Sequence, residues 1–424
     1  MRVATLFKPA FLILVPVLAS FVLWAVPGTG TYLRGFASRS DLNPASLSIL
    51  IIWYAVCVGV VIAGAHTGRS TPRLTTLEPS SNENNFERTF YWVITLMSAV
   101  GVGWSYVSVG GQFSIGTVVS SGQANLLSSA LGDGSSLATL RYSAIVAAPL
   151  AVGRTYTRRA SWPLAILNVV LLLGVALLSS RLSIIMATVV FIFLLWRERP
   201  TAQFRLSWLI AGGAFLFALL AVFNYTRNSN FYRLLGVENP IAMNAYQILA
   251  YVGTPTQVAV GVADGMFRGA ISGNETFESA AVVLVPTFLQ TVKSDKSAAL
   301  DPALYNYQVD VAPNLNANSA FADTFANYGY WGLLLTLVGL FFAGLIYGHF
   351  LQYKSYVSTV SAVIAYGLLE YWRGFLFLQG IIVFLIVSVV IAAFVASALT
   401  PPARDHPQHA RSRTLARGFA GSSS

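Results

Sequence analysis

The chain has 424 residues, of which 55% are apolar and only 10% are charged, and its mean hydropathy is +0.65. Soluble domains carry about 25% charged residues, so this chain has too little charge to cover a surface that faces water on all sides. Its single cysteine, Cys57, excludes a disulfide framework and a zinc site built from cysteines. The composition predicts an all-α, polytopic helical membrane protein.

Ten stretches are apolar enough to cross a bilayer, which takes about 20 residues. Arg2 and Lys8 precede the first stretch and no small-residue cleavage site follows it, so we expect a retained first span. In chain order the stretches are 9–27, 46–65, 90–110, 137–153, 161–178, 181–196, 207–224, 328–350, 355–371 and 375–398.

Lysine and arginine placement predicts the orientation of these spans. With the N-terminus inside, the cytoplasmic segments hold 16 cations and five acids, whereas the outer segments hold nine cations and 11 acids. Arg141 is counted separately because it falls inside a span. The formal net charge of +10 is therefore a topology signal, and no nucleic-acid partner is expected. Both termini are predicted to be cytoplasmic.

This reading divides the chain into four parts. Residues 1–224 hold spans one to seven, 225–327 form a large outer-face loop, 328–398 hold spans eight to ten, and 399–424 are a basic, disordered tail. Apolar residues of 241–252 share one helical face, so we expect short helices that cover the bundle like a lid. No internal repeat supports an inverted-repeat transporter.

Charged residues at the predicted outer ends of spans are the main candidates for a site. Arg181 follows two serines between spans five and six, Arg141 lies one turn inside span four, and Glu370 and Arg373 flank the turn between spans nine and ten. Snorkelling to headgroups, or a Glu370–Arg373 ion pair, would explain them without function. A planar guanidinium also binds phosphate oxygens in bidentate fashion, which suits a lipid-linked diphosphate.

Three segments carry a recognisable combination of motifs. The first is "LLSSRLSIIMATVVFIFLLW", where two small residues and Arg181 open a helix. The second, "GNETFESAAVVLVPTFLQTVKSDK", runs from a Gly-x-x-Thr stretch to a proline and a basic residue. The third, "NANSAFADTFANYGYWGLLL", holds the positions Asn318, Ser319, Asp323, Tyr328, Gly329 and Gly332. Together they resemble the bacterial O-antigen polymerases, or oligosaccharide repeat-unit polymerases, which are related to the O-antigen ligases.

The resemblance implies a helical fold like that of the GT-C-like membrane glycosyltransferases and a location in the bacterial cytoplasmic (inner) membrane. It implies polymerisation of undecaprenyl-diphosphate-linked oligosaccharide repeat units into a surface polysaccharide (O-antigen, capsule or exopolysaccharide). The expected partners are that lipid-linked oligosaccharide, membrane lipid, and a chain-length regulator and a flippase of the same pathway. No metal or nucleotide cofactor is expected.

Within this hypothesis, Arg181, Arg373, Arg141 and Arg268 are the candidates for binding the diphosphate, and Arg268 could equally be a surface arginine. A general base for the acceptor hydroxyl should be a carboxylate. Asp323 is the first candidate and Glu370 the second, although a first-turn acid such as Asp323 also suits the helix dipole.

Two other functions remain open. A ligase would be expected to use a histidine in the outer loop, but His66, His349, His406 and His409 all fall on the predicted cytoplasmic side. A transporter or flippase of lipid-linked sugars should place charges at mid-membrane depth.

Overall fold

The computed structural model describes residues 3–25, 43–74, 77, 83–111, 114, 116, 118, 127, 136–178, 182–199, 206–234, 236–286 and 318–400. This part of the chain is all-helical, as the composition predicted, and has no strand. Each of the ten predicted apolar stretches overlaps a helix or a helical run, although residues 375–379 of the tenth are not helical. The basic tail, 401–424, lies outside the described residues.

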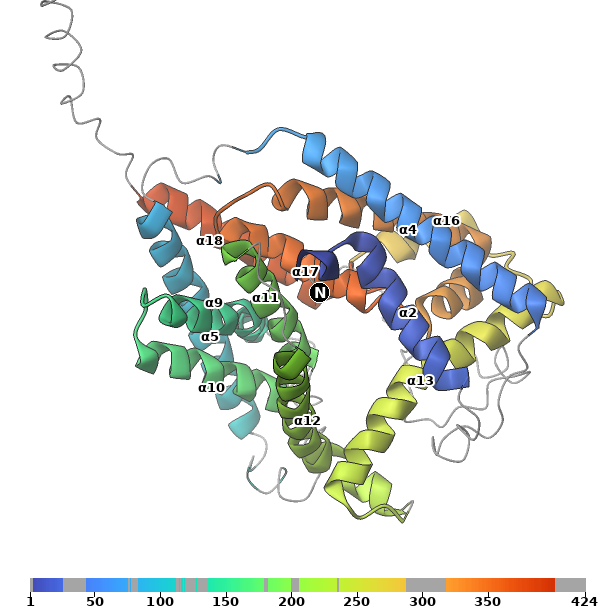
Figure 1. Cartoon of the computed structure of the whole chain (residues 1–424), viewed down its shortest axis with the longest axis horizontal. Coiled ribbons are helices and arrows are strands. Elements are labelled where there is room, and N and C mark those ends of the chain that lie inside the picture. Colours follow the sequence, from blue (N-terminus) through green and yellow to red (C-terminus); the bar gives the residue numbers. More distant parts are fainter. Residues whose placement is uncertain are drawn as a thin grey trace, which may run out of the picture.

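The helices in chain order are shown in Figure 1. They are α1 (Val3–Leu6), α2 (Pro9–Ala25), α4 (Pro44–Ser70), α5 (Glu83–Gly110), α8 (Ser136–Thr139), η2 (Leu140–Ser143), α9 (Ala144–Tyr156), α10 (Trp162–Leu178), α11 (Leu182–Glu198), α12 (Leu206–Leu234), α13 (Pro240–Phe267), α14 (Phe277–Ala281), η3 (Val282–Leu284), α16 (Ala320–Phe350), η5 (Tyr356–Ser358), α17 (Thr359–Leu369) and α18 (Gly380–Leu399).

Four described helices are long and apolar enough to cross a membrane, namely Pro44–Ser70, Glu83–Gly110, Ala320–Phe350 and Gly380–Leu399. The other predicted spans form shorter apolar helical stretches, such as Pro9–Ala25, Trp162–Leu178 and Ile210–Thr226. The structure therefore supports a helical membrane protein.

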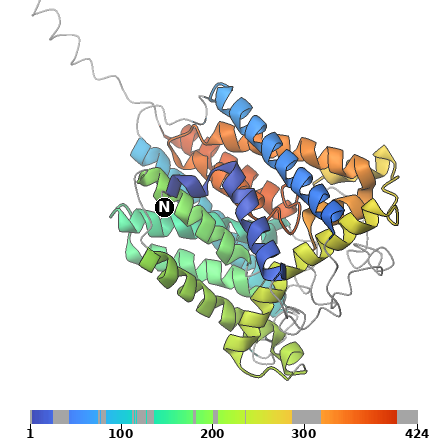
Figure 2. The same cartoon turned by 45° about the vertical axis from the view of Figure 1, so that its right-hand side comes forward.

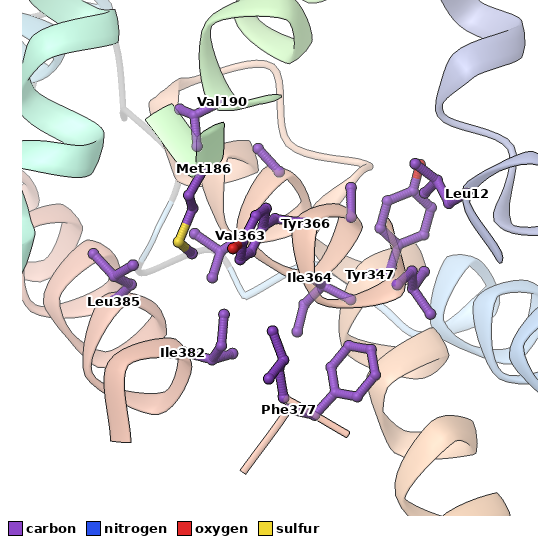
Figure 3. Close-up of a cluster of buried hydrophobic side chains, with 14 of the residues drawn as sticks. Leu12, Met186, Val190, Tyr347, Val363, Ile364, Tyr366, Phe377, Ile382 and Leu385 are labelled. Atoms are coloured by element: carbon purple, nitrogen blue, oxygen red, sulfur yellow. The ribbon is translucent and has the colours of Figure 1, made fainter. Parts of the chain in front are cut away.

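The helices form two groups (Figures 1 and 2). Helices α5, α9, α10 and α11 pack on one side, and α2, α4, α13 and α16 pack on the other. Helix α17 lies between them and contacts α11, α2, α16 and α18. Residues 359–368 of α17 are all buried, and Figure 3 shows Val363, Ile364 and Tyr366 among side chains of both groups. A helix that is apolar on every side is stable only when protein or lipid surrounds it completely.

Helices α4 and α16 pack closely because each presents two glycines spaced four residues apart. A Cβ on Gly64 would lie 2.2 Å from Phe341 O, and one on Gly348 would lie 2.1 Å from Ala65 O. Gly68 and Gly344 make equally close approaches. Small residues at this spacing let helix backbones meet within a membrane, where van der Waals packing drives association.

The predicted loop of short helices between spans seven and eight differs from the structure. Residues 240–267 form a single 28-residue helix, α13, whose buried face packs against α2, α4, α12 and α16. Its second half is rich in small residues (GTPTQVAVGVADG). Small residues allow the helix to be buried on several sides, so its sequence shows no simple amphipathic pattern. Only α14 and η3 match the expected short helices, and residues 287–317 lie outside the described part.

Candidate functional site

An apolar groove of about 600 Å³ runs between α2, α4 and α13. Its walls include Leu18 and Phe21 of α2, Ile51 of α4 and Ala259 of α13, and Trp372 also lines it. Leu18 and Ile51 are 58% and 59% exposed, so the groove opens sideways, onto the surface that would face lipid. Its size falls within the range of about 300–1,000 Å³ that holds small-molecule ligands.

Polar contacts fix the groove wall that α2 and α13 share. Ser20 Oγ donates to the carbonyl oxygen of Val252 at 2.6 Å, and Trp24 Nε1 donates to Gln257 Oε1 at 2.6 Å. These groups are buried, where an unpaired donor would be costly. The contacts therefore hold the two helices in one register along the groove.

Glu370 and Arg373 form a buried ion pair in the turn between α17 and α18. Arg373 Nε donates to Glu370 Oε2, its Nη1 donates to the Tyr251 hydroxyl, and its guanidinium lies 5.0 Å from the Tyr251 ring centre. The two charged side chains are only 10% and 8% exposed. The carboxylate of Glu370 supplies the counter-charge of the buried Arg373 guanidinium. Arg373 is therefore held as a cation within the protein.

This ion pair lies deeper than we expected from the sequence. The hydroxyl of the neighbouring Tyr371 is 3.3 Å from Cys57 Sγ, which lies 14 residues, or about 20 Å, along α4 from Asn43. We expected this turn at one end of the bundle. The helical run 356–369 spans only about 21 Å, less than the hydrocarbon core of a bilayer, so the turn comes beside the middle of α4.

Asp323 lies in the first turn of α16. The residue before that helix, Ser319, caps it, and Ser319 Oγ lies 3.5 Å from the Tyr54 hydroxyl in the groove wall. The Asp323 side chain hydrogen-bonds Asn318, but its Oδ1 is shielded from solvent and has no hydrogen-bond partner in the described part of the chain. A buried acceptor left unpaired is costly and marks a place where a ligand could bind.

A kink at Gly329 brings together two of the segments that carry the family resemblance. Gly329 has φ 59° and ψ −152°, and the next backbone amide, that of Tyr330, donates to the carbonyl oxygen of Gly273 at 3.1 Å. Phe325 also packs close to Gly273. The Gly-x-x-Thr stretch and the segment before span eight therefore form one local unit.

Arg268 lies where α13 ends, near the Asn43 end of α4. Its Nε is 2.9 Å from Asp264 Oδ2, and the same aspartate accepts a hydrogen bond from Asn43 Nδ2. The Arg268 side chain is 54% exposed, whereas Asp264 is 1% exposed. Arg268 therefore keeps donors that can reach a ligand outside the bundle.

The two remaining arginine candidates are not joined to this region by any described contact. Arg141 Nη1 donates to the carbonyl oxygen of Ala138 at 2.7 Å, and its Nη2 donates to the Tyr142 hydroxyl at 3.0 Å, so these side-chain hydrogen bonds stay within its own turn. Arg181 lies outside the described residues.

Sequence reasoning missed the tyrosines that connect the site. Tyr251 binds Arg373, while Tyr54 packs edge-on against Tyr371 with ring centres 6.3 Å apart and also reaches Ser319. A tyrosine in an apolar helix gives no distinctive pattern, because core packing and interfacial belts use the same residue. Only the tertiary contacts show that these rings link the groove, the ion pair and α16.

Comparison of the chain with protein-family models, with curated proteins and with solved structures gives no match.

Proposed function

We propose that this protein is a membrane glycosyltransferase that polymerises polyprenyl-diphosphate-linked oligosaccharide repeat units into a surface polysaccharide. The observation that carries the proposal is the laterally open apolar groove. Of its wall residues, Trp372 is next in sequence to Arg373, and the Tyr54 hydroxyl lies 3.5 Å from Ser319 Oγ at the start of α16. A substrate with a long apolar tail and a charged head needs both surfaces next to each other. The resemblance supplies the reaction, and the meeting of two of its segments at Gly273 and Gly329 supports it.

In the arrangement we propose, the polyprenyl tail lies in the groove and the diphosphate lies near the end of α13. Arg268 is the favoured diphosphate ligand because it is half exposed there, whereas Glu370 and Tyr251 already occupy Arg373. In this arrangement the Glu370–Arg373 pair has a structural role. Glu370 orients Arg373 toward Tyr251, inside the bundle. Arg141 and Arg181 remain candidates from the sequence alone.

Asp323 is the proposed general base. Its unpaired Oδ1 can accept the proton of a sugar hydroxyl as that oxygen attacks the anomeric carbon of the donor. The bond between the anomeric carbon and the diphosphate oxygen breaks, and the diphosphate leaves with its charge next to a guanidinium.

Reconstitution of the purified chain with undecaprenyl-diphosphate-linked repeat units tests the proposal. A ladder of products spaced by one repeat unit, formed without added nucleotide, is the expected result. Ile51→Trp, which fills the groove, should abolish the ladder, whereas Ile52→Trp is the matched control because Ile52 is equally exposed but does not line the groove. No ladder from correctly folded protein would refute the proposal.

A transporter of lipid-linked sugars is the second candidate, because the Glu370–Arg373 pair lies beside the middle of α4, where a transport pathway would need charge. Movement of repeat units between leaflets without any ladder would favour it.

A further inference from the structure

A second, polar cavity of about 380 Å³ lies far from the groove, at the Thr71 end of α4. It forms where the first turn of α5, the turn after α9, the last turn of α11 and the turn before α17 meet. Arg197, in its wall, donates to the carbonyl oxygens of Leu351 and Tyr353, and the Tyr353 hydroxyl accepts from Leu74 N. These contacts place the cavity at the opposite end of α4 from Asn43.

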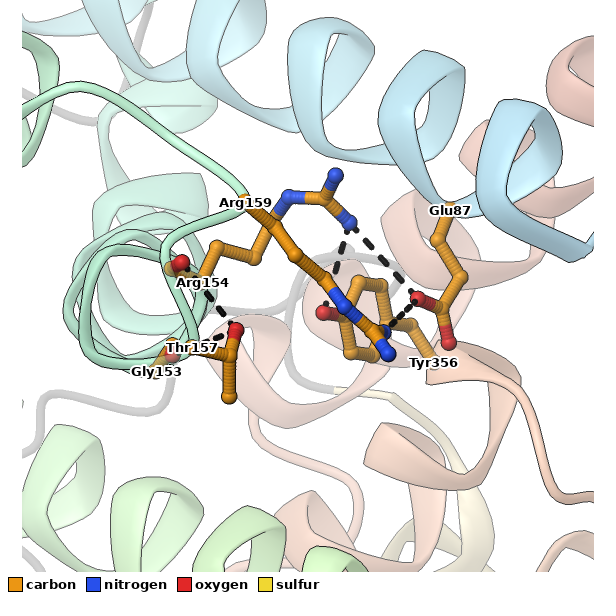
Figure 4. A network of polar contacts seen from close by, with 6 residues as sticks. All are labelled: Glu87, Gly153, Arg154, Thr157, Arg159 and Tyr356. Atoms are coloured by element: carbon orange, nitrogen blue, oxygen red, sulfur yellow. Dashed lines mark hydrogen bonds and ion pairs between the residues drawn. The ribbon is translucent and has the colours of Figure 1, made fainter.

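Charged groups of both signs line this cavity, with cations in excess. Glu87 is held between Arg154 at 3.6 Å and Arg159 at 3.5 Å, as Figure 4 shows, so these charges largely neutralise one another. With Arg154 included, five cations surround the cavity against three carboxylates, a net charge of +2. The cations are Arg154, Arg159, Arg197, Arg199 and Lys354, and the carboxylates are Glu83, Glu87 and Glu198.

Ser355 adds a buried polar group to the cavity wall. The residue is 3% exposed, and its Oγ has no hydrogen-bond partner in the described part of the chain. It precedes the helical run Tyr356–Leu369 at the N-cap position, yet its side chain makes no capping bond. The hydroxyl therefore has hydrogen-bonding capacity left for a ligand in the cavity.

The surroundings favour a lipid over a soluble anion. Tyr156, over whose ring Arg199 lies at 5.1 Å, is 63% exposed, and Trp162 is 71% exposed. Exposed aromatic side chains of this kind gather at the depth of lipid headgroups. A small apolar depression, lined by Leu150 and Phe191, shares Glu198 and Tyr356 with the polar cavity. A polar cavity next to an apolar surface fits an amphiphile.

We propose that this cavity binds the phosphate of an anionic phospholipid headgroup, with Lys354, Arg199 and the Ser355 hydroxyl as its ligands. Basic pockets between membrane helices are suited to such headgroups. This site shares no lining residue with the groove, so the proposal does not depend on the proposed glycosyltransferase activity.

Thermal unfolding of the full chain in detergent, followed by tryptophan fluorescence, measures binding as stabilisation by added lipid. Phosphatidylglycerol should raise the unfolding temperature, whereas phosphatidylcholine and inorganic phosphate should not. Lys354→Gln should weaken the apparent affinity for phosphatidylglycerol about fivefold. Arg88→Gln is the matched control, because Arg88 is an exposed arginine of the same end outside the cavity, and should change affinity less than twofold.

Ser355→Ala separates ligand binding from general electrostatics because it changes no charge. Without lipid it should leave the unfolding temperature unchanged or raise it, since it removes an unpaired buried hydroxyl, yet it should weaken phosphatidylglycerol binding at least twofold. Equal stabilisation by phosphatidylcholine, equal stabilisation by inorganic phosphate, or equal affinities of the Lys354→Gln and Arg88→Gln variants would each overturn the proposal.

Discussion

Replacing Gly329 with alanine tests whether the two segments that meet at this residue act as one unit. Gly329 has φ 59° and ψ −152°, a region of backbone space that is essentially restricted to glycine. Its added Cβ would lie 2.1 Å from the carbonyl oxygen of Gly273, the atom that accepts the Tyr330 amide hydrogen bond. The substitution therefore strains the backbone and separates the two segments.

The contributions to the destabilisation can be summed from the structure. The backbone conformation costs about 1–3 kcal/mol for alanine, the overpacking costs about 1–3 kcal/mol, and weakening of the hydrogen bond costs about 0.5–1.5 kcal/mol. Gly236→Ala is the matched control, since Gly236 has φ 72° but no atom within 4 Å of an added Cβ. Gly236→Ala should be destabilised only by the unfavourable backbone conformation, by about 1–2 kcal/mol. Gly329→Ala should therefore be less stable than Gly236→Ala by about 1.5–5.5 kcal/mol.

The assay is thermal unfolding of both variants in the same detergent, together with glycan synthesis by membranes that contain equal amounts of protein. We expect Gly329→Ala to unfold at a lower temperature than Gly236→Ala and to make no long glycan. Equal unfolding temperatures and equal product ladders would show that the contact between Gly273 and Gly329 does not hold the site.

Three further outcomes follow from the same contacts. Gly348→Ala should lower the unfolding temperature by forcing α4 and α16 apart, a destabilisation of about 1–3 kcal/mol. Gly59→Ala is the control, because open space surrounds Gly59, and it should not lower the unfolding temperature. An unchanged unfolding temperature of Gly348→Ala would contradict the close packing of α4 and α16. Arg268→Ala should raise the KM for the lipid-linked substrate at least fivefold, as kinetics on reconstituted, folded protein would measure. An unchanged KM would remove Arg268 from the site. Asp323→Asn should abolish the ladder, measured on gels beside Glu278→Gln, an exposed acid whose substitution should have no effect.

The sequence determined the all-helical class, because a high apolar content and few charges leave a strong signal in composition, and four of the described helices are long and apolar enough to cross a membrane. It also offered a Glu370–Arg373 ion pair as the alternative to a functional site, since residues three apart at a helix end meet, and the structure shows that pair. The depth of that pair was not predictable, because it depends on how far the short α17 reaches beside α4.

Long-range packing decided the rest of the candidate site. The groove exists because α13 is one long helix buried against α2 and α4. The small residues that permit this burial give no amphipathic pattern, and for that reason the sequence predicted a surface loop instead of α13. The link from Tyr54 to Ser319 joins residues 265 positions apart, and the bond from Tyr330 to Gly273 depends on a backbone conformation that no periodicity reveals. Local sequence fixes which residues are helical and which are apolar, whereas the close approach of distant glycines and tyrosines follows only from packing in three dimensions.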